Sequence, residues 1–121
     1  MDAMDDVEVT HVDATQVPQP GGAVVLDVRE PDEWSRGHIA GSQHIPLGEL
    51  PARFDEIDAD LPLYVICHAG GRSLKASQYL ARVGYEPINV TGGMLSWVAA
   101  GRPLVTEDSP EDAVPDAAQE P

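Results

Sequence analysis

Short apolar runs alternate along this chain with stretches whose apolar residues recur at helical spacing. Runs rich in β-branched residues predict strands at Glu8–Thr10, Ala23–Val28, Leu63–Cys67 and Pro87–Thr91, with a shorter one at Ser42–Ile45. Residues 24–26 form a continuous apolar run, which is typical of a strand buried on both faces of a parallel sheet. The apolar pattern therefore favours a parallel sheet.

Four further segments predict helices. Glu30–Gly37 carries a proline in its first turn, and Leu47–Ile57 has apolar residues near helical spacing. Ser73–Val83 has an apolar stripe and is followed by Gly84, a residue suited to a left-handed helix end; Met94–Ala99 forms the last helix. Strands that alternate with helices predict an α/β layer fold with right-handed crossovers.

Length and composition narrow the organisation of the chain. The 121 residues, 42% of them apolar, suffice for one core, so we expect one domain over residues 1–105. Residues 106–121 are acidic and lack aromatic residues, which predicts a disordered tail. The apolar stretches fall far short of the roughly 20 residues of a membrane-spanning helix, and the first residues lack the pattern of a secretory signal. We therefore expect a cytoplasmic protein that does not contact a membrane.

The net charge is −14, but much of it lies at the two ends. Residues 1–13 hold five acidic residues and residues 106–121 hold six, with no lysine or arginine in either segment. The middle carries ten acidic and seven basic residues, a net −3. This balance argues against nucleic acid as a partner, whereas a local positive site in the middle could still attract a small anion.

Cys67 is the only cysteine, and it lies where a strand is predicted to end and a helix to begin. Gly70 and Gly71 allow the loop to point successive amide N–H groups at the sulfur, while the helix amino terminus and Arg72 both favour a negative charge there. We therefore expect Cys67 to be a thiolate at neutral pH and the centre of the chemistry. Since the chain has no second cysteine, an outside acceptor or a second molecule must remove whatever Cys67 acquires.

The spacing from Cys67 to Arg72 separates two kinds of cysteine chemistry. Cysteine-dependent phosphatases have five residues between the cysteine and the arginine, which would place the arginine at position 73, where this chain has Ser73. The loop here is one residue shorter and suits one sulfur atom better than a phosphoryl group with three equatorial oxygens. The spacing therefore favours sulfur chemistry.

Four motifs, in order and at matching spacing, resemble those of single-domain rhodaneses, a family of sulfurtransferases. They extend from about Val9 to Pro103 and comprise Leu26–Glu30, then Glu33–Trp34 with Gly37–Ser42 and Ile45–Leu47, then Cys67–Ser73, and finally Gly92–Met94 with Trp97 and Gly101. The resemblance implies a three-layer α/β fold, in which a central, mainly parallel sheet of about five strands has helices on both faces.

The resemblance also implies an activity, the movement of a sulfane sulfur from a donor such as thiosulfate to cyanide or a thiol. Cys67 would be the nucleophile and would carry the sulfur as a persulfide, with no metal or organic cofactor. Arg72 would attract the anionic donor and stabilise the leaving sulfite, whereas His68 could either contact the donor or face water. The substrate-binding residues that the resemblance implies are those of the loop: His68, Ala69, Gly70, Gly71, Arg72 and Ser73.

Other motif residues have structural as well as functional interpretations. Asp27 and Arg29, at the end of a buried strand, could belong to the active pocket, but we favour a role in bracing neighbouring loops. The histidines outside the loop are too scattered to predict a zinc site: His11, His38 and His44. The apolar residues of the last helix are interpreted as core packing: Met94, Trp97 and Val98.

Two other functions remain open. One is a rhodanese-fold regulatory or binding module with little turnover, which the presence of Cys67 disfavours. The other is a phosphatase or arsenate reductase of related fold, which the short loop disfavours. A single copy of the domain predicts an open pocket unless a dimer or a partner covers it. We expect a monomer or homodimer that takes sulfur from a small anionic donor and delivers it to a small-molecule or protein thiol.

Overall fold

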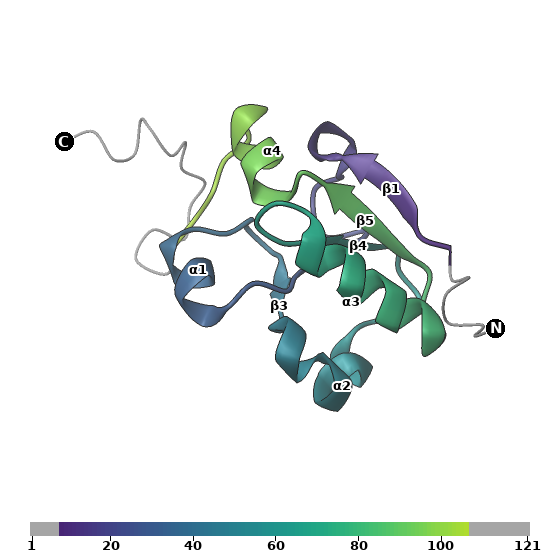
Figure 1. Ribbon diagram of the computed structural model, residues 1–121. Helices are drawn as coiled ribbons and strands as arrows, with labels where there is room; N and C mark the ends of the chain where they lie inside the picture. Colours follow the sequence, from purple (N-terminus) through teal and green to yellow (C-terminus); the bar gives the residue numbers. More distant parts are fainter. Residues whose placement is uncertain (1–7, 107–121) are drawn as a thin grey trace.

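A five-stranded sheet, with every pairing parallel, forms the centre of the computed structural model, which describes residues 8–106 (Figure 1). The strands are β1 (Thr10–Asp13), β2 (Val24–Asp27), β3 (Gln43–His44), β4 (Leu63–Ile66) and β5 (Pro87–Thr91). Their order in space is β1-β5-β4-β2-β3. The predicted α/β fold with about five parallel strands is confirmed, and β4, which leads to Cys67, lies in the middle of the sheet.

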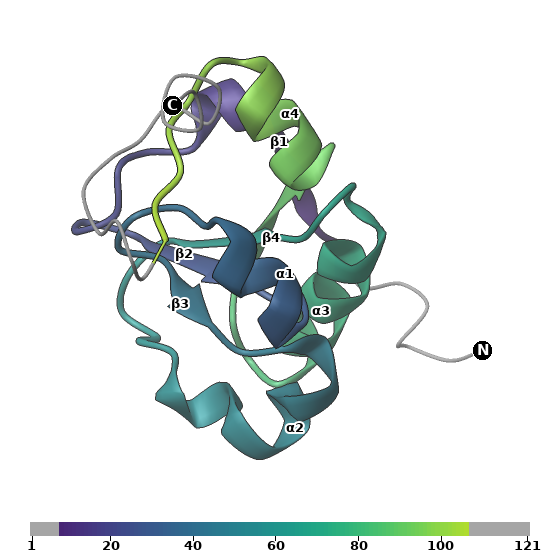
Figure 2. The ribbon, with the colours of Figure 1, turned by 90° about the vertical axis from the view of Figure 1, so that its left-hand side faces the viewer.

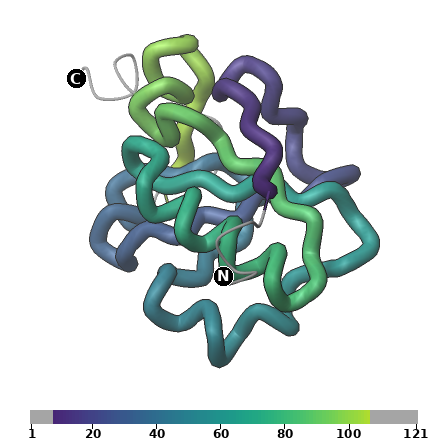
Figure 3. Tube along the Cα trace, turned by 45° about the vertical axis from the view of Figure 1, so that its right-hand side comes forward, coloured from purple at the N-terminus to yellow at the C-terminus, as the bar shows by residue number. Residues whose placement is uncertain are grey.

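Helices cover both faces of the sheet. They are α1 (Pro31–Arg36), α2 (Leu50–Arg53), α3 (Gly71–Arg82) and α4 (Gly93–Ala99). Three 3-10 turns accompany them: η2 (Ala14–Gln16) follows β1, and η3 (Leu47–Glu49) and η4 (Phe54–Glu56) flank α2. One core packs α2 and α3 against the sheet, and a second packs α4 and η2 against the other face. Figure 2 and Figure 3 both show α2 and α4 on opposite sides of the molecule. The three-layer arrangement places the β4–α3 loop between the two helical layers.

Three predicted elements differ from the structure. The first strand was expected at Glu8–Thr10 but covers Thr10–Asp13, because this exposed edge strand is defined by its pairing with β5 rather than by an apolar run. Leu47–Ile57 is not one helix: Pro51 lies in the first turn of α2 and lacks the N–H that would continue a helix from the preceding turn. The third helix begins at Gly71 rather than at Ser73.

The described chain ends on a short pairing between two distant segments. The N–H of Val105 donates to the carbonyl of His38 at 2.8 Å, and the N–H of His38 donates back to Val105 at 2.9 Å. Apart from Thr106, the predicted acidic tail lies outside the described residues. Within residues 8–106, every helix is too short or too polar to span a membrane.

Candidate active site

The loop between β4 and α3 turns around the sulfur of Cys67. The N–H of Gly70 donates to Cys67 Sγ at 3.1 Å. Gly70 has a φ of 114° and precedes the first residue of α3. A side chain at position 70 would be strained at this φ, and its Cβ would lie only 3.2 Å from the backbone nitrogen of Gly92. The turn that directs the amide at the sulfur therefore requires glycine.

Burial and hydrogen bonds shift the pKa of the Cys67 thiol in opposite directions. The residue is only 1% exposed, and this burial, the largest single effect, raises its pKa. The Ser73 hydroxyl and the backbone N–H groups of Ser73, Gly70 and Ala69 together outweigh burial, so the pKa of Cys67 is lowered from its ordinary value. The direction agrees with the sequence prediction, and the main groups that lower the pKa are hydrogen-bond donors of the loop.

Ser73 connects the sulfur to a short polar chain. Its Oγ lies 3.4 Å from Cys67 Sγ and 2.6 Å from Oδ1 of Asn89, a buried residue of β5. Nδ2 of Asn89 lies 3.2 Å from Nδ1 of His11 on β1. The hydroxyl has one proton, which it can donate to Asn89 while the thiol donates to the hydroxyl, or turn toward the sulfur when the thiol ionises. Ser73 can therefore serve both protonation states of Cys67.

The beginning of α4 holds the backbone of the loop from the other side. The N–H of Met94 donates to the carbonyl of Cys67 at 2.7 Å, and the N–H of Leu95 donates to the carbonyl of His68 at 3.1 Å. A Cβ at Gly93 would lie 2.3 Å from the Cys67 carbonyl oxygen, far inside contact distance. Only glycine at position 93 lets the loop backbone pack this closely against the start of α4.

Glu33 of α1 engages the guanidinium of Arg72. Nη1 and Nη2 of Arg72 donate to Oε1 and Oε2 of Glu33 at 2.7 and 2.9 Å. The hydrogen bonds from Arg72 are the main reason that the pKa of Glu33 falls to about 2, and the same contact raises the pKa of Arg72. The Cys67 thiolate adds to this rise, so the Arg72 charge acts on the sulfur although its donors are directed to Glu33.

Asp27 and Arg29 form a buried ion pair at the end of β2. Nη2 of Arg29 lies 2.8 Å from Oδ2 of Asp27 and also donates to the carbonyl of Gly37 at 2.8 Å. The side chains are 1% and 7% exposed, respectively. These contacts tie the strand end to the residue that follows α1, and Arg29 also reaches the wall of the pocket described next.

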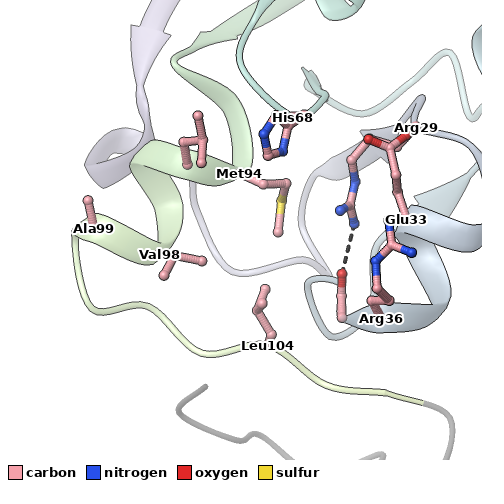
Figure 4. Close-up of a pocket in the computed structure, with 10 residues that line it drawn as sticks. Arg29, Glu33, Arg36, His68, Met94, Val98, Ala99 and Leu104 are labelled. Atoms are coloured by element: carbon pink, nitrogen blue, oxygen red, sulfur yellow. Dashed lines mark hydrogen bonds between the residues drawn. The ribbon is translucent and has the colours of Figure 1, made fainter. Parts of the chain in front are cut away.

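A pocket of about 630 Å³ lies between α1 and α4, with His68 of the loop in its wall (Figure 4). One side is charged and contains Arg29, Glu33 and Arg36; the other side is apolar and contains Met94, Leu95, Val98, Ala99 and Leu104. Trp97 is 2% exposed, as the core interpretation predicted. Val98 is 41% exposed, so its assignment to the core was wrong: the apolar stripe of α4 is divided between the core and the pocket.

The histidines of the α1 region pack on an aromatic ring. The ring of Trp34 stacks on those of His38 and His44, with centroids 3.6 and 4.6 Å apart. Nε2 of His44 lies 2.8 Å from the carbonyl oxygen of Arg29. Among residues 8–106, no three histidine, cysteine, aspartate or glutamate side chains gather as metal ligands. These two histidines therefore have structural partners around α1.

Comparison with known proteins agrees with this architecture. The family model described as "Rhodanese-like domain" matches residues 10–100. This chain belongs to the rhodanese-like family. A thiosulfate sulfurtransferase of Stutzerimonas stutzeri is 38% identical over 77 residues, which cover 63% of this chain and 71% of that protein. The crystal structure of a rhodanese-related protein from Thermoplasma volcanium has a TM-score of 0.68 and 41% identity, covering 71% of this chain and 86% of that one.

Some relatives of this rhodanese-like chain are longer. YrkF of Bacillus subtilis is 43% identical over 74 residues, which cover 60% of this chain but only 40% of that protein.

Sequence reasoning named the loop but missed two residues that act on it. Glu33 lies in one of the motifs that resemble those of the rhodaneses, but its pairing with Arg72 joins residues 39 positions apart and leaves no local signal in the sequence. Asn89 lies within a predicted strand; a polar residue in a buried run was the available sign that it binds a partner.

Proposed function

We propose that this rhodanese-like protein is a sulfurtransferase and that Cys67 carries the transferred sulfur. The observation that carries the proposal is the setting of Cys67 Sγ, which faces the Gly70 N–H at 3.1 Å and the Ser73 hydroxyl at 3.4 Å. These groups lower the pKa of the thiol despite its burial. A thiolate held by preorganised donors is both a nucleophile and a stable leaving group, as a sulfur carrier requires.

In the proposed first half-reaction, the Cys67 thiolate bonds to the outer sulfur of a donor such as thiosulfate. The bond between that sulfur and the rest of the donor breaks, and its electron pair leaves on sulfite. The amides that hold the thiolate are then placed to hold the terminal sulfur of the persulfide. Arg72 supplies positive charge near the loop, and His68 lies in the wall of the pocket from which a donor would approach.

In the second half-reaction, a thiolate or cyanide attacks the terminal sulfur and restores Cys67. Since the chain has no other cysteine, the acceptor is a separate small molecule or protein thiol. Two features support sulfur transfer over phosphatase chemistry: the four residues between Cys67 and Arg72, and the direction of the Arg72 donors toward Glu33 rather than toward a bound phosphoryl group.

Intact mass spectrometry of the full chain tests this function. After incubation with thiosulfate, the wild type should gain the mass of one sulfur atom, lose it on reduction, and form thiocyanate when cyanide is added. Cys67→Ser keeps nearly the same shape and should show none of these changes. A wild type that gains no sulfur and forms no thiocyanate would contradict the proposal, and Cys67-dependent release of phosphate from an aryl phosphate would favour a phosphatase instead.

A further inference from the structure

Asn89 links the exposed side chain of His11 to the hydroxyl that contacts Cys67. His11 lies on β1, an edge strand of the sheet, directly opposite Asn89 of β5. Nδ2 of Asn89 lies 3.2 Å from Nδ1 of His11, and Oδ1 of Asn89 lies 2.6 Å from Oγ of Ser73. Asn89 and Ser73 are 4% and 0% exposed, whereas His11 is exposed to solvent. A line of polar contacts therefore leads from solvent to the buried sulfur.

The direction of each hydrogen bond in this line follows from the atoms that carry protons. An amide nitrogen donates and an amide oxygen accepts, so Nδ1 of His11 must lack a proton in order to bind Nδ2 of Asn89. Oδ1 of Asn89 in turn accepts the single proton of the Ser73 hydroxyl. While His11 is neutral, with its proton on Nε2, the amide therefore draws the hydroxyl proton away from Cys67.

A proton on Nδ1 of His11 reverses this arrangement. The protonated ring donates from both nitrogens, and Asn89 can accept from it only if the amide turns by about 180°, which brings Nδ2 toward Ser73. The hydroxyl then accepts from Nδ2 and directs its own proton elsewhere. Two acceptors lie within reach, Cys67 Sγ at 3.4 Å and the Gly70 carbonyl at 3.1 Å. The ionised sulfur is the stronger acceptor because it is charged.

The elements packed around His11 present neutral groups at this point, Asn89 of β5 and Ser73 of α3. Asp13, two residues along β1 on the same side of the strand, accepts the N–H of Thr15 at 2.8 Å. The other charged or imidazole side chains of these segments and of the active loop are exposed or paired: Glu8, Lys75, Arg82, Glu86 and His68 are exposed, and Arg72 pairs with Glu33. Histidine is the side chain that normally changes charge between about pH 5 and 8, so His11 is the group at the end of this line that can respond to pH.

We propose that His11 is a positioning residue that acts on Cys67 through Asn89. Protonation of the ring turns the amide, and the Ser73 hydroxyl then donates to the sulfur and stabilises the thiolate. The coupling is reciprocal, because ionisation of Cys67 favours the proton on His11 by the same factor. Cys67 consequently keeps more thiolate below neutral pH than an isolated thiol would. The inference deepens the proposed function and rests on it in taking this thiolate as the reacting group.

Substitutions at two neighbouring positions separate this relay from a simple effect of charge. Lysine at position 11 can only donate, as protonated histidine does, whereas the side-chain oxygen of glutamine can accept from Asn89 at any pH. His11→Lys is therefore compared with His11→Gln. Thr10→Lys and Thr10→Gln are the matched controls, because Thr10 is also exposed and faces the opposite side of the strand. The ultraviolet absorbance of the thiolate, with Cys67→Ala as the baseline, gives the acid dissociation constant of Cys67 in each full chain.

We expect this constant to be about fivefold higher in His11→Lys than in His11→Gln, which is the effect of about one neutral hydrogen bond. The two Thr10 variants should differ by less than about twofold, because solvent screens an exposed charge. Asn89→Leu should abolish the difference between the two position-11 variants, since the turning amide is then absent. In the wild type, nitrogen NMR should show Nδ1 of His11 without a proton at about pH 8, and the Asn89 amide signals should move as the ring gains its proton.

Three results would each overturn the inference: equal differences at positions 10 and 11, a difference at position 11 that persists with Asn89→Leu, or a proton on Nδ1 of His11 at about pH 8 in the wild type. The thiolate titration needs no sulfur donor, so the two proposals can fail separately. If thiosulfate still loads the wild type when the relay is refuted, the proposed function stands. If no sulfur is loaded although the titrations behave as expected, the relay stands as a property of Cys67 and the proposed function fails.

Discussion

Replacement of Gly93 by alanine would test how α4 positions the nucleophile. The new Cβ would lie 2.3 Å from the Cys67 carbonyl oxygen and 2.6 Å from that of His68, whereas carbon and oxygen normally approach to about 3.3 Å. Both atoms belong to the backbone of the active loop, so no side-chain rotation relieves the contact. The loop and the start of α4 must separate by about 1 Å.

Gly93→Ala should lower the free energy of unfolding for two reasons. The φ of 56° at position 93 costs a residue with a Cβ about 1–2 kcal/mol. Separation weakens two hydrogen bonds, from Met94 to Cys67 and from Leu95 to His68, each worth about 1 kcal/mol. Gly101→Ala is the matched control: Gly101 has a φ of 79°, and a Cβ there would meet nothing within 4 Å. It should incur only the backbone cost.

Urea unfolding and persulfide loading give two readouts for this pair. Gly93→Ala should lose about 2 kcal/mol more than Gly101→Ala, which corresponds to a further fall in Tm of about 10 °C for a domain of this size. A displacement of about 1 Å at the nucleophile should slow loading by about 100-fold, while Gly101→Ala should load like the wild type when folded. Equal stability and equal loading in the two variants would refute the proposed seating of the loop on α4.

Two further substitutions examine the polar contacts of the loop. Ser73→Ala removes the hydroxyl that helps to lower the Cys67 pKa. Alkylation of Cys67 by iodoacetamide at neutral pH should therefore slow by about tenfold, and the midpoint of its pH profile should rise. An unchanged pH profile would contradict this role of Ser73. Glu33→Gln removes a carboxylate whose pKa Arg72 lowers from 4.5 to about 2. The ionised carboxylate therefore stabilises the folded protein fully above pH 4.5, and this stabilisation is lost as the pH falls toward 2. The stability difference between wild type and Glu33→Gln should therefore narrow over that interval in acid titrations, and a difference independent of pH would be the contrary result.

The sequence by itself determined the unit of strand, loop and helix around Cys67. An apolar run, two glycines and a helix start lie within about twenty residues, and each acts through local backbone preferences that need no distant partner. The parallel sheet was also predictable, because a strand buried on both faces leaves a continuous apolar run at residues 24–26. The direction of the Cys67 pKa followed from the same local features.

Only the tertiary structure decided which groups act on that loop. Glu33 reaches Arg72 across 39 residues, and Asn89 reaches Ser73 across 16, because the order of the strands brings separate chain segments to one edge of the sheet. The pocket likewise forms between α1 and α4, which lie far apart along the chain. Sequence periodicity shows that α4 has an apolar stripe, but the packing partners of each side chain decide which part is core and which part can meet a ligand. Local preferences depend on neighbours along the chain, whereas charge pairing and cavity shape depend on neighbours in space.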